Sequence, residues 1–113
     1  MVALAVGTIV LVPFPFSDLT KSKLRSAVVL AMVDKEDVIL SQITSNPYTD
    51  IQAIELSDTD FSKGSLQRIS FVRPGKLFTA HSSLIVSHVG NLKKEKFNFI
   101  IDEIVKIFRR NNL

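Results

Sequence analysis

The stretch TIVLV at residues 8–12, followed at once by PFP at residues 13–15, decides the fold of this chain. It is rich in β-branched side chains, which favour strands, and Pro13 stops the run. Proline lacks the N–H group that a central strand needs, so Pro13 and Pro15 indicate a strand end or a sheet edge. We therefore predict a buried strand over residues 8–12 with an extended continuation.

The beginning of the chain looks like a signal peptide at first sight, because MVALAVGTIVLV at residues 1–12 is almost wholly apolar. It has no basic segment in front, and no clear cleavage site follows before Ser17. Gly7 and Pro13 interrupt a run that is shorter than the ~20 residues of a membrane span. We expect a short extended lead-in to the first strand, no membrane contact and a cytoplasmic location.

The composition is that of one folded domain over residues 1–113, with 46% hydrophobic and 22% charged residues. The absence of cysteine excludes disulfides, thiolate metal sites and cysteine nucleophiles. Two histidines are too few for a histidine-rich metal site, so we expect no metal and no cofactor. The net charge of +3 is a mild preference for polyanionic partners.

Short apolar runs separated by polar turns continue along the chain. The predicted strands are 26–33, 38–43, 51–56 and 67–72, with extended structure resuming at 76–79. The charged turn at 34–37 joins strands 26–33 and 38–43 into a hairpin. Pro74-Gly75 is expected to end the strand 67–72. Residues 58–64 indicate a turn or one helical turn ended by Gly64, and residues 84–89 fit a strand or a short helix equally well.

The last segment predicts a helix from about Lys93 to Arg110, with Asn91 as its N-cap. Its apolar side chains follow helical spacing and predict core packing; they are Phe97, Ile100, Ile101, Ile104, Val105 and Phe108. Phe99 and Ile107 fall off this stripe and suit self-association. The sum is a mainly β fold of five to seven strands, curved into a partly open barrel, with the C-terminal helix packed against it.

A basic stretch, KSKLRS at residues 21–26, precedes the second strand. Lys21, Lys23 and Arg25 suit an arm that attracts phosphate, and an ordinary solvated loop explains them as well. Arg25 differs from the lysines because we place it at the strand boundary. There the sheet would hold the guanidinium for bidentate phosphate binding and transition-state stabilisation.

Two further groups of polar residues lie at strand ends. Thr44 and Ser45 can point at a phosphate or can cap the turn before Pro47, and the pattern leaves both open. A second basic cluster comprises Arg68, Arg73 and Lys76. If the sheet closes, this cluster faces the first one across a groove.

The remaining polar candidates have simple surface roles. His81 and His88 are the only imidazoles, and neither fits a catalytic triad pattern, so we expect surface or turn positions. Glu55, Asp58 and Asp60 are expected to be surface carboxylates, because their spacing is too loose for a metal site.

The order of these pieces resembles that of the MazF/PemK family of toxins. GTIVLVPFPFSD at residues 7–18 and KLRSAVVL at residues 23–30 are similar to the family's opening strand, variable loop and arginine-led second strand. Shorter similarities continue in the same order to the start of the last helix; they are ITS at 43–45, SFVR at 70–73, KLFT at 76–79 and VGNL at 89–92.

The resemblance implies an SH3-like barrel that acts as a homodimer. It implies a metal-independent endoribonuclease of a toxin–antitoxin system, acting on single-stranded RNA such as mRNA. In such enzymes the ribose 2′-OH attacks its own phosphodiester and leaves a 2′,3′-cyclic phosphate. The implied protein partner is an antitoxin whose short acidic C-terminal segment occupies the RNA groove.

The resemblance also implies roles for residues. Arg25 matches an arginine that stabilises the phosphate and transfers a proton, Thr44 a threonine that hydrogen-bonds it, and Arg73 a catalytic arginine of the plasmid-borne branch. The implied RNA-binding residues are Ser17, Lys21, Lys23, Ser45 and Lys76.

Three positions depart from the family pattern. Ser26 replaces a proline, His81 replaces an aspartate, and Gly75 stands where the plasmid-borne branch has an acidic catalytic residue. The general base is therefore open. Two alternatives remain: a non-catalytic binding toxin of the same fold, of the gyrase-poison type, and a degenerate member that binds without turnover.

Overall fold

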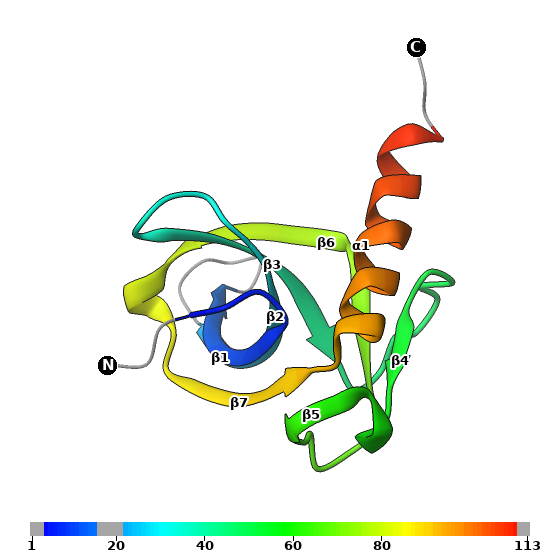
Figure 1. The fold of residues 1–113 in the computed structure, drawn as a ribbon, viewed down its shortest axis with the longest axis horizontal. Helices are drawn as coiled ribbons and strands as arrows, with labels where there is room; N and C mark the ends of the chain where they lie inside the picture. Colours follow the sequence, from blue (N-terminus) through cyan, green and yellow to red (C-terminus); the bar gives the residue numbers. More distant parts are fainter. Residues whose placement is uncertain (1–3, 16–21, 111–113) are drawn as a thin grey trace.

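The computed structural model describes residues 4–15 and 22–110, which form one antiparallel sheet and one long helix (Figure 1). The strands are β1 (Thr8–Pro15), β2 (Ser22–Met32), β3 (Asp37–Thr44), β4 (Ile54–Leu56), β5 (Phe61–Gly64), β6 (Ser70–His81) and β7 (Ser87–Leu92). Two short 3-10 turns, η1 (Asp58–Asp60) and η2 (Ser82–Leu84), precede β5 and β7, and the helix is α1 (Lys94–Arg109). The mainly β class with a C-terminal helix is confirmed.

The sheet curls into a half-barrel. Its strand order is β4-β6-β3-β2-β1-β7-β5, so β4 and β5 are the two edges. Only Ser57 and η1 separate these edge strands along the chain, and this short link brings the two edges together (Figure 1). The closing of the sheet leaves the ends of β2 and β3 beside the segment 65–69 that joins β5 to β6.

The core lies on both faces of the sheet, because successive side chains of a strand point to opposite faces. On β1, Ile9 belongs to the cluster that also holds Ile100 and Ile104 of the helix. Val10 and Val12 belong to a second cluster with Leu40 of β3. All three β1 residues are fully buried, as the TIVLV pattern predicts.

The helix packs on the core through its first three turns, and in its last turn Ile107 remains half-buried beside Gly75 of β6. Phe97 and Ile101 cover the core cluster, whereas Val105 is 40% exposed and Phe108 is 67% exposed. The prediction that these last two residues are core is wrong, because the end of α1 rises beyond the sheet in Figure 1. Phe99 is exposed as expected, but Ile107 is half-buried, and its Cδ1 lies 4.0 Å from where a Cβ on Gly75 would stand.

Two local predictions at Pro74-Gly75 and Asn91 are also wrong. β6 runs through Pro74-Gly75 without a break, with Val72 opposite Ile43 and Leu77 opposite Ser41 of β3. The extra residues form a bulge, where the missing N–H of proline costs no ladder bond. Asn91 lies within β7 and its Nδ2 donates to Thr8 Oγ1 at 3.1 Å, so Lys93 is the N-cap of α1.

The region expected as a turn over residues 58–64 contains the strand β5. Gly64 has φ +68°, and a Cβ there would lie 2.3 Å from the carbonyl oxygen of Val89. Glycine therefore permits the close approach of β5 to β7, and it does not end a helix. Residues 84–89, left open by the pattern, contain the end of η2 at Leu84, a two-residue link and the first three residues of β7. Within the described ranges no helix is long and apolar enough to cross a membrane.

Candidate functional site

A groove of about 360 Å³ lies across the ends of β2 and β3. The segment 65–69 between β5 and β6 forms its other wall. Lys23 and Arg25 come from β2, Thr44 and Ser45 from the end of β3 and the residue after it, and Gln67 and Arg68 from the segment 65–69. The groove therefore brings together four residues that the resemblance singles out: Lys23, Arg25, Thr44 and Ser45.

Arg25 lies inside a strand and not at its boundary. β2 begins at Ser22, so Arg25 is its fourth residue and stands opposite Val12 of β1. The sequence prediction places the start of this strand at residue 26, directly before the apolar run. The residues before that position are also paired with β1, so the strand starts four residues earlier. Arg25 is half-buried, and the sheet fixes the base of its side chain as expected.

Thr44 caps the turn that follows β3, which is one of the two roles the sequence allows. Its hydroxyl donates to the Asn46 carbonyl oxygen and accepts from the Asn46 N–H, both at 3.1 Å. The Asn46 Oδ1 in turn accepts from the Tyr48 N–H at 3.0 Å. Because the Thr44 proton is engaged in this turn, the exposed Ser45 hydroxyl, which has no hydrogen bond within the described residues, is the better donor toward the groove.

Arg73 does not line the groove. Its Nε donates to Asp50 Oδ2 at 2.8 Å, and the two side chains are only 28% and 14% exposed. This hydrogen bond holds the pKa of Asp50 below its usual range, with a smaller contribution from the Gln52 N–H. The pair ties the loop 45–53, which follows Thr44, to β6.

The other predicted RNA-binding residues also differ in whether they line the groove. Lys76 is exposed on β6 and is not part of the groove lining. Ser17 and Lys21 lie outside the described residues. Of the second basic cluster only Arg68 reaches the groove, where it faces the elements that carry Lys23 and Arg25.

Sequence reasoning missed the wall formed by residues 65–69. Gln67 carries no motif, and Arg68 was named only as a member of a basic cluster. The sequence does show that Gln67 and Arg68 follow Gly64 and lie between two strands. It does not show where this segment lies in space, because its position depends on the pairing of β5 with β7, which are distant in sequence.

The groove is electropositive at its described residues. Its lining includes Lys23, Arg25 and Arg68 and no Asp, Glu or His side chain. Over residues 4–15 and 22–110 no three side chains of His, Cys, Asp or Glu come close enough to hold a metal ion. Such a surface can bind phosphate and can stabilise negative charge.

His81 takes part in a small surface cluster away from the groove. Its Nδ1 accepts from the Ser83 N–H at 3.1 Å and lies 2.7 Å from the Ser83 hydroxyl, so it caps η2. Its Nε2 lies 3.4 Å from Glu36 Oε2. All three side chains are exposed, and His88 is exposed on β7, so the surface and turn roles expected for both histidines are confirmed.

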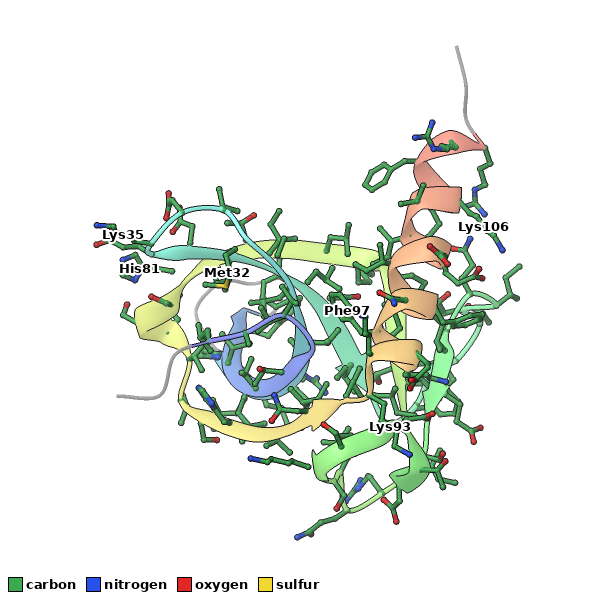
Figure 2. The ribbon with its side chains drawn as sticks, viewed as in Figure 1. Met32, Lys35, His81, Lys93, Phe97 and Lys106 are labelled. Atoms are coloured by element: carbon green, nitrogen blue, oxygen red, sulfur yellow. The ribbon has the colours of Figure 1, made fainter. Side chains whose placement is uncertain are left out.

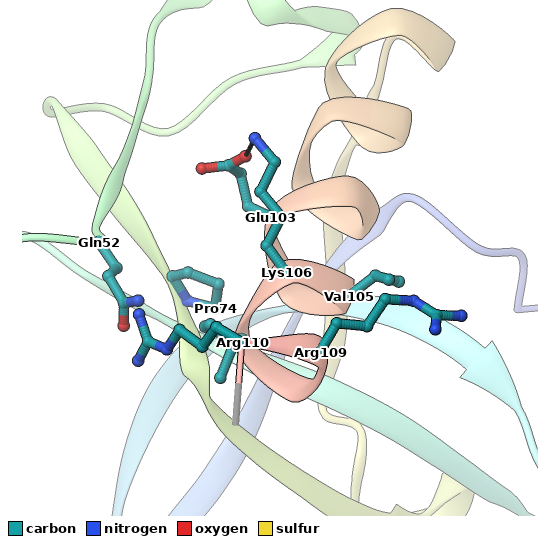
Figure 3. A pocket seen from close by; sticks show the side chains of 8 residues that line it. Gln52, Pro74, Glu103, Val105, Lys106, Arg109 and Arg110 are labelled. Atoms are coloured by element: carbon teal, nitrogen blue, oxygen red, sulfur yellow. Dashed lines mark ion pairs between the residues drawn. The ribbon is translucent and has the colours of Figure 1, made fainter. Parts of the chain in front are cut away.

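A second hollow, of about 580 Å³, lies where the end of α1 meets β6 (Figure 3). Pro74 and Val105 line it, and Gln52 and Arg110 point toward each other at its side. Beside it Lys106 pairs with Glu103 at 2.8 Å, which raises the pKa of Lys106. Of the site residues implied by the resemblance, none of those within the described ranges lines this hollow. Figure 2 shows how far the Lys106 side chain stands from the barrel end that carries Met32 and His81.

Solved structures of other proteins share this fold. This chain shares its fold with an endoribonuclease. One of the matching structures is an endoribonuclease in complex with its cognate antitoxin from a mycobacterial species, with a TM-score of 0.71, covering 94% of this chain and 95% of that chain. The sequences are 13% identical, so the likeness shows the fold. No family model and no curated protein matches.

Proposed function

We propose that this chain is the toxin of a toxin–antitoxin pair and that it cleaves single-stranded RNA in the groove beside Arg25. The observation that carries the proposal is the gathering of Arg25, Thr44 and Ser45 in one groove that is positively charged. The fold shared with an endoribonuclease over nearly the whole of both chains supports the same reaction class.

In the proposed reaction the nucleophile belongs to the RNA. The ribose 2′-OH loses its proton and attacks the adjacent phosphorus, the bond from phosphorus to the 5′ oxygen breaks, and that oxygen takes up a proton. The products are a 2′,3′-cyclic phosphate and a 5′-OH. Arg25 stabilises the charge that builds on the phosphate oxygens, and Ser45 donates a hydrogen bond to one of them. Thr44 holds the turn that positions Ser45.

Attack by the 2′-OH requires a group that accepts its proton. The described groove residues include no carboxylate or imidazole, and a guanidinium group has only donors and so is a poor base. This observation favours a second candidate, a protein that binds RNA in the groove without turning it over. The two candidates share the binding surface and differ in whether a bond breaks.

The same charge suits the proposed antitoxin partner. An acidic segment would complement the positive charges of Lys23, Arg25 and Arg68, which line the groove. For the proposed homodimer, the exposed side chains of Val105 and Phe108, which are three residues apart on α1, supply apolar surface on one side of the helix.

The test is incubation of the purified protein with a pool of single-stranded RNAs in excess EDTA, followed by mapping of the new ends. We expect cuts that leave 2′,3′-cyclic phosphate and 5′-OH ends. An RNA with a 2′-deoxyribose at the cut position should stay intact, because it lacks the nucleophile. Binding of the pool without any cut would replace the nuclease by the second candidate, and absence of both would remove the groove as an RNA site.

A further inference from the structure

A smaller hollow of about 270 Å³ adjoins the groove on the far side of the segment 65–69. Three residues, Leu66, Gln67 and Arg68, line both the groove and this hollow. The two depressions are therefore separated by one short wall. A polymer ligand that lies in the groove and passes over Arg68 would place its next monomer in the hollow.

The hollow has apolar surfaces of the kind that a flat ring contacts. Leu56 and Phe61 are buried and form its inner side, and Leu66 is half-buried. Ile69, the residue directly before β6, is 61% exposed although it is a large aliphatic residue. An exposed isoleucine beside buried apolar side chains suits the face of an unstacked base, because bases present an apolar surface on both sides.

The polar side chains of the hollow differ in whether they already have hydrogen-bond partners. The Ser57 hydroxyl is engaged within the turn, with Thr59 Oγ1 at 2.9 Å and Asp60 Oδ2 at 3.3 Å. The Asp58 carboxylate is exposed and has no hydrogen bond or ion pair within the described residues. Such a group accepts hydrogen bonds and cannot donate them when ionised.

We propose that this hollow is a nucleobase subsite for the nucleotide next to the phosphate held by Arg25. The proposal rests on the proposed function for the identity of the chain as single-stranded RNA. Ile69 and Leu66 contact the face of the base, and Arg68 on the wall contacts the intervening phosphate. Asp58 accepts a hydrogen bond from an exocyclic amino group.

The charge of Asp58 sets the preference among bases. A carboxylate repels an approaching polyanion unless the ligand supplies an N–H group. Adenine, cytosine and guanine carry an exocyclic amino group, whereas uracil has carbonyl oxygens in its place and can donate only through its ring N3–H, which lies between two carbonyl oxygens that face a carboxylate unfavourably. The subsite therefore selects amino-bearing bases and disfavours uracil. A peptide side chain is the other possible occupant, but it does not account for the shared wall with the phosphate groove.

The experiment measures cleavage of a randomised RNA pool by the full chain and by two subsite variants. Asp58→Asn keeps the shape and adds a donor, so the discrimination against uracil at one position beside the cut should fall about tenfold, within the range of a good base contact. Ile69→Ala should lower cleavage of all sequences without changing the preference. The matched controls are Asp102→Asn on the exposed face of α1 and Ile51→Ala, which is 97% exposed and lines neither depression.

The failures of the two proposals are separable. If the wild type cleaves RNA and Asp58→Asn leaves every base preference unchanged, the subsite is wrong and the nuclease stands. If the wild type cleaves nothing, an uncleavable tetranucleotide with a 2′-deoxyribose at each position is titrated while amide NMR shifts are followed. Shifts at Phe61 and Ile69 that are larger with an adenine-bearing than with a uracil-bearing tetranucleotide in the wild type, and similar with both in Asp58→Asn, uphold the subsite without the nuclease. Shifts that are absent from these residues, or that show no base preference in the wild type, overturn the subsite.

Discussion

Arg25 and Arg73 occupy similar places in the sequence and different places in the molecule. Both lie on strands within basic stretches, and the family resemblance gives both a role at the phosphate. Arg25 lines the electropositive groove, which has no described carboxylate in its lining. Arg73 is held by Asp50 at 2.8 Å and ties a loop to β6. The comparison teaches that two arginines in similar basic stretches can have different roles, because the pairing of distant strands and loops decides which one lines the groove and which one holds a loop.

The largest expected effect is on cleavage. Arg25→Ala should lower single-turnover cleavage about 10²- to 10³-fold, the usual result of removing one preorganised donor to transition-state charge. Arg73→Ala should lower it by less than about tenfold, because its loss acts only through the loop that follows Thr44. Both variants are compared at saturating protein, together with their thermal midpoints.

The comparison breaks if Arg73→Ala cleaves as poorly as Arg25→Ala while it melts like the wild type. Arg73 would then leave Asp50 when RNA binds, and the catalytic role implied by the resemblance would return. Arg25→Lys is the matched check on the groove. It keeps the charge but loses the bidentate geometry, so intermediate activity is expected.

The next effect is on stability and its dependence on pH. Asp50→Asn should lower the free energy of unfolding at pH 7 by about 1.5 to 3 kcal/mol, the range for a hydrogen bond to a charged group. The pKa of Asp50 is lowered from 3.8 by the Arg73 hydrogen bond, so folding favours its ionised form. This stabilisation is complete above the pKa of the unfolded carboxyl and is lost as the pH falls through the folded pKa.

Urea unfolding of wild type and Asp50→Asn at pH 7 and at pH 3 measures this dependence. The difference between the two proteins should shrink at the lower pH. A difference that stays constant would mean that the Arg73–Asp50 pair contributes through shape and not through charge. Asp102→Asn, an exposed carboxylate on α1, is the control for general charge effects.

The sequence predicts those parts of the fold that depend on local pattern. TIVLV at 8–12 and the stripe through Ile100 and Ile104 both appear as expected, because side-chain alternation and helical period are local properties. The continuation of β6 through Pro74 could not be predicted. It depends on a bulge against β3, and a bulge is a property of the pair of strands. The same reason hides the role of Gly64, whose constraint is the Val89 carbonyl.

The candidate site divides in the same way. Arg25 and Thr44 could be brought together from sequence only through the family resemblance, since neither spacing nor composition places the two strands. The Arg73–Asp50 pair spans 23 residues, and nothing in either local stretch indicates it. The turn bonds of Thr44 with Asn46 were foreseeable as one of two roles, because residues two apart meet in a local turn.

A smaller effect separates capping from substrate binding at the end of β3. Thr44→Val keeps the shape but removes both hydroxyl bonds to Asn46, so it should lower the free energy of unfolding by about 1 kcal/mol and also slow cleavage. Ser45→Ala should slow cleavage and leave the thermal midpoint unchanged, because the Ser45 hydroxyl has no hydrogen bond within the described residues. Equal cleavage by Ser45→Ala and wild type would remove Ser45 from the proposed mechanism.

The smallest effect tests the two lysines that the resemblance assigns to RNA. Each phosphate neutralised by the protein adds about −0.7 to the slope of log affinity against log salt for a single strand. Lys23 lines the groove and Lys76 does not, so Lys23→Ala should make the slope shallower by about 0.7 and Lys76→Ala should leave it unchanged. Affinity for an uncleavable 2′-deoxy oligonucleotide, measured by fluorescence anisotropy at several salt concentrations, gives both slopes. A shallower slope for Lys76→Ala would extend the RNA path over β6, past the Arg73–Asp50 pair, and would make the two arginine regions parts of one surface.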